Sequence, residues 1–281
     1  MSKTKERIHD SNLRCKQGLG QNFIYDEDLL AALVASSEIT KDDDVLEIGP
    51  GAGSMTKYLC DAAHHVLSIE LDERLIPLLT AFLAERDNFT LVQGDVMTLN
   101  LADVTKDLRK PLSVVANIPY YITTPLLTML LASPIPIRRM ALMVQKEVAD
   151  RLSEKPGSKI YGTPSVKLAW YGTAERVGVI GRNVFWPAPN VDSALVLFKR
   201  YPGGHTPAAD NADGSVVDRE TVFRLIDAAF GQRRKTLHAA LKKIVPSEAF
   251  EKAGIDPTRR GETLTIDEFV ALARALDEVF A

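Results

Sequence analysis

The chain has 281 residues, of which 46% are hydrophobic, and its formal net charge is −3. This length suits one large domain, or a larger and a smaller one, with a substantial core. The slightly acidic balance excludes a uniformly basic surface, so any site for a polyanion must be a local patch. No apolar run reaches the roughly 20 residues that span a bilayer, and the polar beginning is unlike a secretory signal. Cys15 and Cys60 lie far apart without ligand-like spacing, which favours reduced thiols and a cytoplasmic protein.

Short β-rich runs alternate with helical segments from residue 44 onward. We expect Asp72 to cap the second of these helices, and Thr124 to cap the helix after the fourth strand with Pro125 at its first position. Alternation of this kind produces parallel strands, and strands buried on both faces read as apolar runs. The sequence therefore predicts an α/β fold with a mainly parallel, Rossmann-like sheet, its strands at 45–49, 65–71, 88–95, 112–117 and 138–145.

The pattern changes after Gly157. The runs PSVKLAWYG (164–172) and SALVLFKR (193–200) are interpreted as strands at the far edge of the sheet, where one of them can be antiparallel. Residues 201–215 are rich in Gly, Pro and Asp and predict a mobile loop or linker. Helical segments follow, so we expect a larger domain at 1–200, a linker at 201–215 and a small all-α domain at 216–281.

A glycine-rich turn follows the first strand, in the segment VLEIGPGAG. Gly49, Gly51 and Gly53 form G-x-G-x-G rather than the G-x-G-x-x-G dinucleotide fingerprint. Glycines here allow a ligand to approach the backbone and leave amides free at the next helix N-terminus. Such a turn is also common as plain structure, so the motif alone is a weak signal.

Polar side chains at successive strand ends strengthen the interpretation. Glu70 ends the next strand, where an acidic side chain accepts hydrogen bonds from ribose hydroxyls, and Asp95 ends the third strand, where it can accept from an adenine amino group. Each carboxylate alone is more commonly a structural cap, but together with Gly49 and Asn117 they stand in register. Glu47 lies beside the glycine turn and suits the ammonium of an amino acid. The combination favours S-adenosylmethionine as the ligand.

The fourth strand ends in Asn117-Ile118-Pro119-Tyr120. These residues could simply end a strand, because Pro stops pairing and Asn favours turns. Beside a methyl donor the same residues have a chemical interpretation: the Asn117 side-chain oxygen and the Ile118 carbonyl accept the N–H bonds of an exocyclic amine. Pro119 fixes the chain, and Tyr120 supplies a ring on which an extruded base can stack. Alignment then supplies the rate, and no general base or metal is required.

At this point the chain resembles the ribosomal RNA adenine N6,N6-dimethyltransferase family, and specifically its bacterial small-subunit group. The resemblance rests on QGLGQNFIYD (17–26), EIGPGAG, IELD, NIPYYITTP, VQKEVADRL, VFWPAPNVDSALV and FGQRRKTL, which run nearly the full length. It implies S-adenosylmethionine as cofactor, donor contacts from Asn22 and Ile24, and two adjacent adenosines near the 3′ end of small-subunit rRNA as substrate. One departure is Pro164, where the family pattern has Leu before Ser165.

Basic residues form local clusters in the acidic chain. We expect the helical domain to bind RNA, while each cluster alone is equally well explained as a solvated helix face. Further cations at Arg259 and Arg260, at Arg138, Arg139 and Lys146, and before Gln21 could add to this surface. The RNA-binding residues predicted are Arg233, Arg234, Lys235, Lys242 and Lys243.

Three other functions stay open at this stage. Methyltransferases acting on DNA adenine or protein amides also use Asn-Pro-aromatic motifs, but these usually read N-P-P-Y, whereas this chain has Ile118 between Asn117 and Pro119. A non-enzymatic ribosome-assembly factor could keep the fold, although the intact donor motifs argue against binding alone. A small-molecule methyltransferase would not need the basic helical segment. We expect a monomer that binds small-subunit rRNA or its precursor particle and no membrane.

Overall fold

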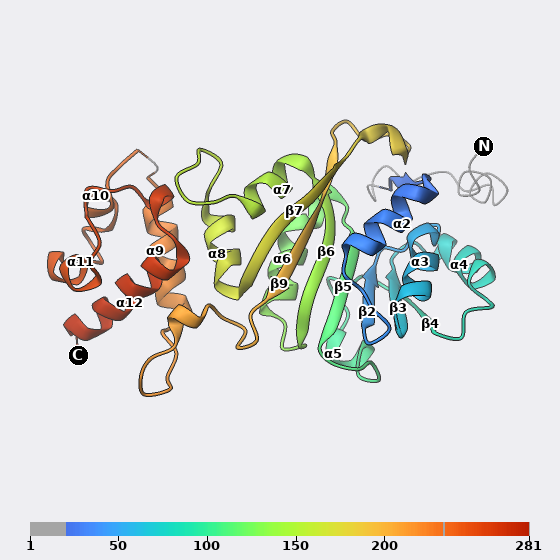
Figure 1. The fold of residues 1–281 in the computed structure, drawn as a ribbon, viewed down its shortest axis with the longest axis horizontal. Coiled ribbons are helices and arrows are strands. Elements are labelled where there is room, and N and C mark those ends of the chain that lie inside the picture. The colour runs from blue at the N-terminus through green and yellow to red at the C-terminus, as the bar shows by residue number, and fades with distance from the viewer. Residues whose placement is uncertain (1–20, 233, 281) are drawn as a thin grey trace. The chain divides into compact units, whose positions relative to one another are not determined.

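The computed structural model describes residues 21–232 and 234–280, and it divides into two compact units (Figure 1). The first unit extends to Ala149 and includes Glu175–Lys199. The second unit comprises Asp150–Ala174 and Arg200–Ala281. The segment before Gln21, with its predicted basic residues and Cys15, lies outside the described residues, as does Arg233.

A seven-stranded sheet, in the order β4-β3-β2-β5-β6-β9-β7, organises the first unit. Five neighbouring strands pair in parallel, and β9 pairs antiparallel with β6, so the predicted mainly parallel sheet is confirmed. β1 and β8 form a separate two-stranded sheet. The strand bounds are β1 Phe23–Ile24, β2 Asp44–Ile48, β3 His65–Glu70, β4 Phe89–Gln93, β5 Leu112–Asn117, β6 Ile137–Gln145, β7 Gly172–Ile180, β8 Phe185–Trp186 and β9 Ser193–Arg200.

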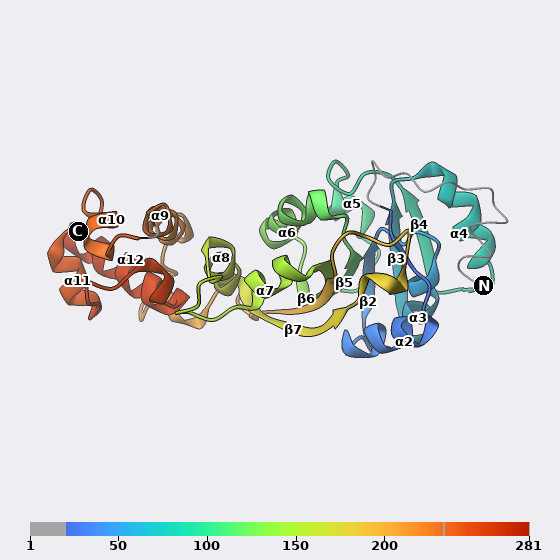
Figure 2. The ribbon, with the colours of Figure 1, turned by 90° about the horizontal axis from the view of Figure 1, so that it is seen from above.

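Helices cover both faces of the sheet, with α2 and α3 on one face and α5 and α6 on the other (Figure 2). Side chains of α2 and α3, including Leu33 and Leu59, pack against Val45, Val66 and Val115 of the strands. All five residues of β2 are buried, because this central strand is covered on both faces. The helices of this region are α2 Glu27–Ser36, α3 Ser54–Ala62, α4 Ile76–Phe82, α5 Leu101–Val104, α6 Thr123–Ala132 and α7 Lys146–Ser153.

Two local predictions were wrong. The segment predicted as a strand at 164–172 contains helix α8, Thr163–Tyr171, because Pro164 suits the first turn of a helix and Ser165 accepts a hydrogen bond from the Gly162 amide. A strand was predicted because the β-branched and aromatic residues of this segment also favour strands. Helix α6 begins at Thr123, not after a Thr124 cap, so Pro125 is its third residue.

The second unit is helical, and it contains α8 together with α9 Arg219–Phe230, α10 Leu237–Leu241, α11 Ser247–Ala253 and α12 Ile266–Phe280. Phe230 contacts the rings of Tyr161 and Phe269 in its core. Residues 201–215 are tied to α12, where Arg274 donates to the carbonyls of Ala208 and Asp210. None of the described helices is long and apolar enough to cross a membrane.

Candidate functional site: a pocket at the carboxyl ends of the strands

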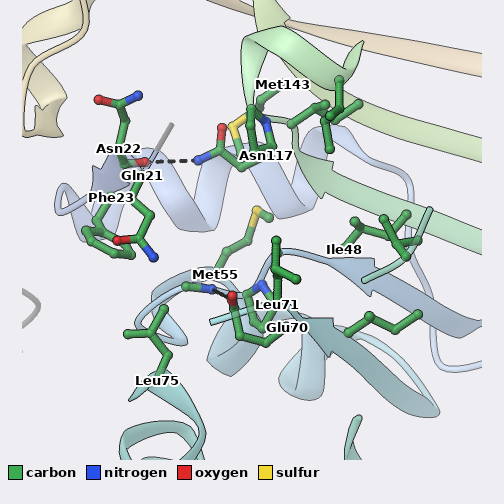
Figure 3. A pocket seen from close by; sticks show the side chains of 18 of the residues that line it. Gln21, Asn22, Phe23, Ile48, Met55, Glu70, Leu71, Leu75, Asn117 and Met143 are labelled. Carbon is green, nitrogen blue, oxygen red and sulfur yellow. Dashed lines mark hydrogen bonds between the residues drawn. The ribbon is translucent and has the colours of Figure 1, made fainter. Parts of the chain in front are cut away.

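A pocket opens where the parallel strands β2, β3 and β5 end, and it lies within the first unit (Figure 3). It encloses about 1300 Å³ of space outside protein atoms, its open mouth included. The carboxyl ends of parallel strands are where doubly wound sheets bind ligands. The predicted site residues that line it are Asn22, Ile24, Gly49, Gly51, Glu70, Asp95, Asn117, Ile118, Pro119 and Tyr120.

The glycine turn between β2 and α3 needs its glycines. Gly49, Gly51 and Gly53 have φ angles of +74°, +59° and +76°, in the left-handed region that L side chains rarely adopt. A Cβ on Gly51 would also lie 2.9 Å from the ring of Phe23, which lines the pocket. Gly53 does not line the pocket; it precedes α3, and a Cβ there would lie 3.0 Å from the Phe82 ring. The turn thus keeps side chains away from the pocket wall.

Glu70 ends β3 and is almost fully buried, with both carboxylate oxygens engaged by backbone amides. One oxygen accepts from the Gly51 amide at 3.0 Å (Figure 3). The other accepts from the Asp72 amide at 2.8 Å. Burial raises the pKa of Glu70, while the two amides oppose that rise. Each oxygen keeps a second lone pair, so the carboxylate can still accept hydrogen bonds from a diol in the pocket.

Asp95 follows β4 and lines the same pocket. Its Oδ1 accepts a hydrogen bond from the Met97 amide at 2.9 Å, which fixes the orientation of the carboxylate. Val96 is buried beside it and also lines the pocket. The combination offers one fixed acceptor next to an apolar wall, which is the environment that an adenine ring with its amino group requires.

Asn117 ends β5, and its side-chain amide has a defined orientation. The Nδ2 group donates to the main-chain carbonyl of Asn22 at 3.2 Å (Figure 3). This bond engages one of the two N–H groups of the amide and orients the side chain, whose oxygen can accept a hydrogen bond from a ligand. The Ile118 amide donates to the Met143 carbonyl, which fixes the chain directly after the strand. Tyr120 is held by a 3.1 Å hydrogen bond between its hydroxyl and that of Ser193.

Comparison with known proteins places these features in a family. The profile described as "Ribosomal RNA adenine dimethylase" matches residues 12–278. The chain belongs to the ribosomal RNA adenine dimethylase family. It is 65% identical to "Ribosomal RNA small subunit methyltransferase A" of Bifidobacterium adolescentis over 97% of this chain and 92% of that protein. It is 41% identical to the protein of the same name from Lactiplantibacillus plantarum, over 99% and 95%. The resemblance predicted from the motifs is therefore confirmed.

Solved structures agree with the dimethylase fold. A dimethyladenosine transferase from Plasmodium falciparum superposes with a TM-score of 0.76 at 23% identity, over 91% of this chain and 98% of that one. The 23S rRNA methyltransferase ErmE superposes with a TM-score of 0.72 at 26% identity, over 91% and 99%. The fold class predicted from the sequence, a Rossmann-like methyltransferase sheet with a helical C-terminal part, is confirmed.

Glu47, like Gly53, is a predicted site residue that does not line the pocket. It is fully buried, and its Oε2 accepts hydrogen bonds from Thr56 at 2.8 Å and Ser68 at 2.5 Å. Its Oε1 has no hydrogen-bond partner among the described residues, and Glu47 does not line the pocket. Burial is the main reason that the pKa of Glu47 rises to about 7. Glu47 therefore bonds Thr56 and Ser68 inside the protein, and its side chain does not face the pocket.

This environment predicts a pH effect on stability. Because the pKa of Glu47 is about 7 in the folded chain and near 4.5 when unfolded, unfolding between these values releases a proton. The free energy of unfolding should therefore fall as pH rises from about 4.5 to 7, by an amount of order 2–3 kcal/mol from this group. Glu47→Gln should flatten that part of the curve, measured by urea unfolding at a series of pH values. An unchanged pH dependence in the variant would contradict the assignment.

The predicted basic residues divide into two groups. Arg138 and Arg139 lie at the beginning of β6, away from the strand ends that form the pocket, and pair with Asp43 and Glu38. Arg259 pairs with Glu268 within the second unit. These partners make them weaker candidates for RNA contact. The described residues of the predicted RNA-binding set, which are all exposed, are Arg234, Lys235, Lys242 and Lys243.

Several lining residues were not predicted from the sequence. Leu71 directly follows Glu70, and Val96 directly follows Asp95 with Met97 after it, so an apolar residue after each carboxylate was an available signal. Met143 pairs with Asn117 across β5 and β6, which becomes visible only once the register is known. Phe185 reaches the pocket on β8, which pairs with β1, and no local pattern in the sequence indicates that pairing.

Proposed function

We propose that this chain transfers methyl groups from S-adenosylmethionine to N6 of two adjacent adenosines near the 3′ end of small-subunit rRNA, which gives N6,N6-dimethyladenosine during ribosome biogenesis. Family membership establishes the enzyme class, and the names of the relatives support the small subunit as target. The single observation that carries the chemistry is the orientation of Asn117, whose nitrogen is held by Asn22 and whose oxygen is left as an acceptor.

The residues that line the pocket support S-adenosylmethionine as its ligand. Glu70 would accept from the ribose hydroxyls, and Asp95 would accept from the adenine amino group beside the Val96 wall. Gly49 and Gly51 keep the wall open at the turn, where a Cβ on Gly51 would already meet Phe23. When bound, S-adenosylmethionine supplies an electrophilic methyl group. Asn22 and Ile24 line the same pocket and are proposed as further donor contacts.

The chain's contribution to transfer is orientation of the acceptor amine. The lone pair of an exocyclic adenine nitrogen is delocalised into the ring, so the amine is a poor nucleophile. Two acceptors, the Asn117 oxygen and the Ile118 carbonyl, would hold its N–H bonds and favour a tetrahedral nitrogen. Pro119 restrains the backbone directly after the Ile118 carbonyl, and Tyr120 would stack on the extruded base. The proton leaves to water after transfer.

The helical C-terminal unit is proposed to bind RNA through its exposed cations. Replacing Arg233, Arg234 and Lys235 together by Ala should weaken RNA binding. It should also reduce the slope of log affinity against log salt concentration by roughly two to three units, because RNA binding with about three fewer phosphate contacts releases fewer counterions. Filter binding of small subunits across a salt series measures the slope, with donor affinity as the control. Parallel lines for variant and parent would mean that these side chains only solvate the helix, and the segment before Gln21 would become the better candidate.

The proposed function is tested with purified protein and radiolabelled S-adenosylmethionine. Calorimetry should show donor binding in the absence of RNA, and label should transfer to small-subunit particles that lack the modification. Donor binding without transfer of label to RNA would contradict small-subunit rRNA as the substrate. The remaining parts of the proposal are a monomeric state, a cytoplasmic location, a precursor of the small subunit as substrate, and a division into a catalytic domain at 1–200, a linker at 201–215 and an RNA-binding domain at 216–281.

A further inference from the structure

A second cavity lies beside the pocket, where β6 ends and β9 begins, and it also belongs to the first unit. It encloses about 740 Å³ of space outside protein atoms, its open mouth included. Gln145, the last residue of β6, pairs with Ser193, the first residue of β9. The residues that line the cavity are Gln145, Lys146, Glu147, Arg182, Asn190, Val191 and Asp192.

The two cavities share a boundary. Ser193 is buried and holds the hydroxyl of Tyr120, which lines the first pocket, while the adjacent Asp192 lines the second cavity. Met143 lines the first pocket, and Gln145 lines the second two residues further along the same strand. The Asp192 carbonyl accepts from the Lys146 amide, and its Oδ1 accepts from the Arg182 amide, so the cavity wall is fixed by the backbone. A strand of RNA with one base in the first pocket would place a neighbouring nucleotide near the second.

The lining suits a base more than a phosphate. Lys146 and Arg182 are balanced by Glu147 and Asp192, so the cavity carries no excess of positive charge. Gln145 and Asn190 offer side-chain amides, which make no hydrogen bonds with the described residues. An amide of this type presents a donor and an acceptor that match N7 and the 6-amino group of adenine. Val191 is 43% exposed and offers an apolar surface for the ring.

We propose that this cavity is a subsite for the nucleotide next to the adenosine being methylated, and that Gln145 and Asn190 recognise its adenine base. The proposal rests on the proposed function, because it concerns the neighbour of the reacting adenosine. Unstacked bases of single-stranded RNA are commonly recognised by hydrogen bonds to their edges. Such a subsite would explain how a pair of adjacent adenosines is selected over a single one.

The test couples a change in the protein with a change in the RNA. Small subunits are reconstituted with the neighbouring adenosine replaced by guanosine, which exchanges the 6-amino donor for a carbonyl acceptor, and methylation of the remaining adenosine is timed. For the parent protein, the replacement should lower kcat/KM about tenfold, on the scale of one amide–adenine contact. For Gln145→Ala combined with Asn190→Ala, both RNAs should react at one reduced rate, with donor affinity unchanged.

Asn183→Ala is the matched control, because Asn183 is an exposed amide close in sequence to Arg182 that does not line the cavity. It should keep the parent's discrimination. Discrimination that persists in the double variant, or that is absent in the parent, would overturn the subsite. Calorimetry with the donor and thermal unfolding show whether the double variant is folded, and if it is not, each single variant is tested in the same way. If the parent methylates neither RNA, it is the proposed function that fails.

Discussion

Asn117→Ala is expected to lower the rate of methyl transfer by a hundredfold or more while leaving donor affinity within about twofold. Removing one preorganised hydrogen-bonding group beside reacting atoms typically costs about 10²–10³ in rate. The variant loses the oxygen that would accept from the adenine amine, and it leaves Glu70, Asp95 and the glycine turn in place. Single-turnover assays with radiolabelled donor and unmodified small subunits measure the rate of methyl transfer, and calorimetry measures donor affinity.

A variant at Asn22 separates the orientation of Asn117 from donor binding. Asn22→Ala keeps the main-chain carbonyl that accepts from Asn117 Nδ2, so it should retain far more transfer activity at saturating donor than Asn117→Ala does. A variant at Asn117 with substantial remaining activity would mean that the acceptor amine is aligned by other groups. A large loss of donor affinity in that variant would instead place Asn117 in the donor site.

Glu70→Ala is expected to weaken S-adenosylmethionine binding by roughly 10- to 100-fold, with little change in RNA binding. The variant removes the proposed ribose acceptor and also leaves the amides of Gly51 and Asp72 without their carboxylate, and each unpaired buried group costs about 1–3 kcal/mol. Calorimetry with the donor measures the effect.

Glu70→Gln provides the graded comparison, because it preserves the size of the side chain and one of its two acceptor oxygens. Its donor affinity should fall between that of the parent and that of Glu70→Ala. If Glu70→Ala binds the donor as tightly as the parent does, Glu70 does not belong to the donor site. Equal loss of donor and RNA binding would show that the variant damages the fold rather than the pocket.

The parallel sheet could be predicted because its strands are apolar runs that end in glycine or polar residues. β5 was predicted at its observed bounds. Gly49, Glu70, Asp95 and Asn117 line one pocket because successive strand ends meet at one edge of a parallel sheet. Helix α8 was missed because Val166, Leu168 and Trp170 also suit a strand, and Pro164 was not interpreted as a first-turn residue. Local patterns leave such a segment ambiguous.

Contacts between distant segments account for what the sequence could not indicate in the site. Glu47 was placed beside the ligand because it adjoins the glycine turn, but its side chain bonds Ser68 on the neighbouring strand β3 instead. The contacts of Asn117 with Asn22 and of Tyr120 with Ser193 each join residues more than 70 positions apart. Long-range contacts of this kind depend on strand order and register, which a single sequence does not provide.

Methylation of adjacent adenosines in small-subunit rRNA is tested most directly by nuclease digestion of the RNA with mass spectrometry. RNA from small subunits of a strain lacking the protein should contain unmodified adenosines at one adjacent pair near the 3′ end. Incubating these subunits with purified protein and S-adenosylmethionine should convert both to N6,N6-dimethyladenosine, and the Asn117→Ala variant should leave them unmodified. Dimethyladenosine at that pair in the strain without the protein, or no conversion by the purified parent, would contradict the account.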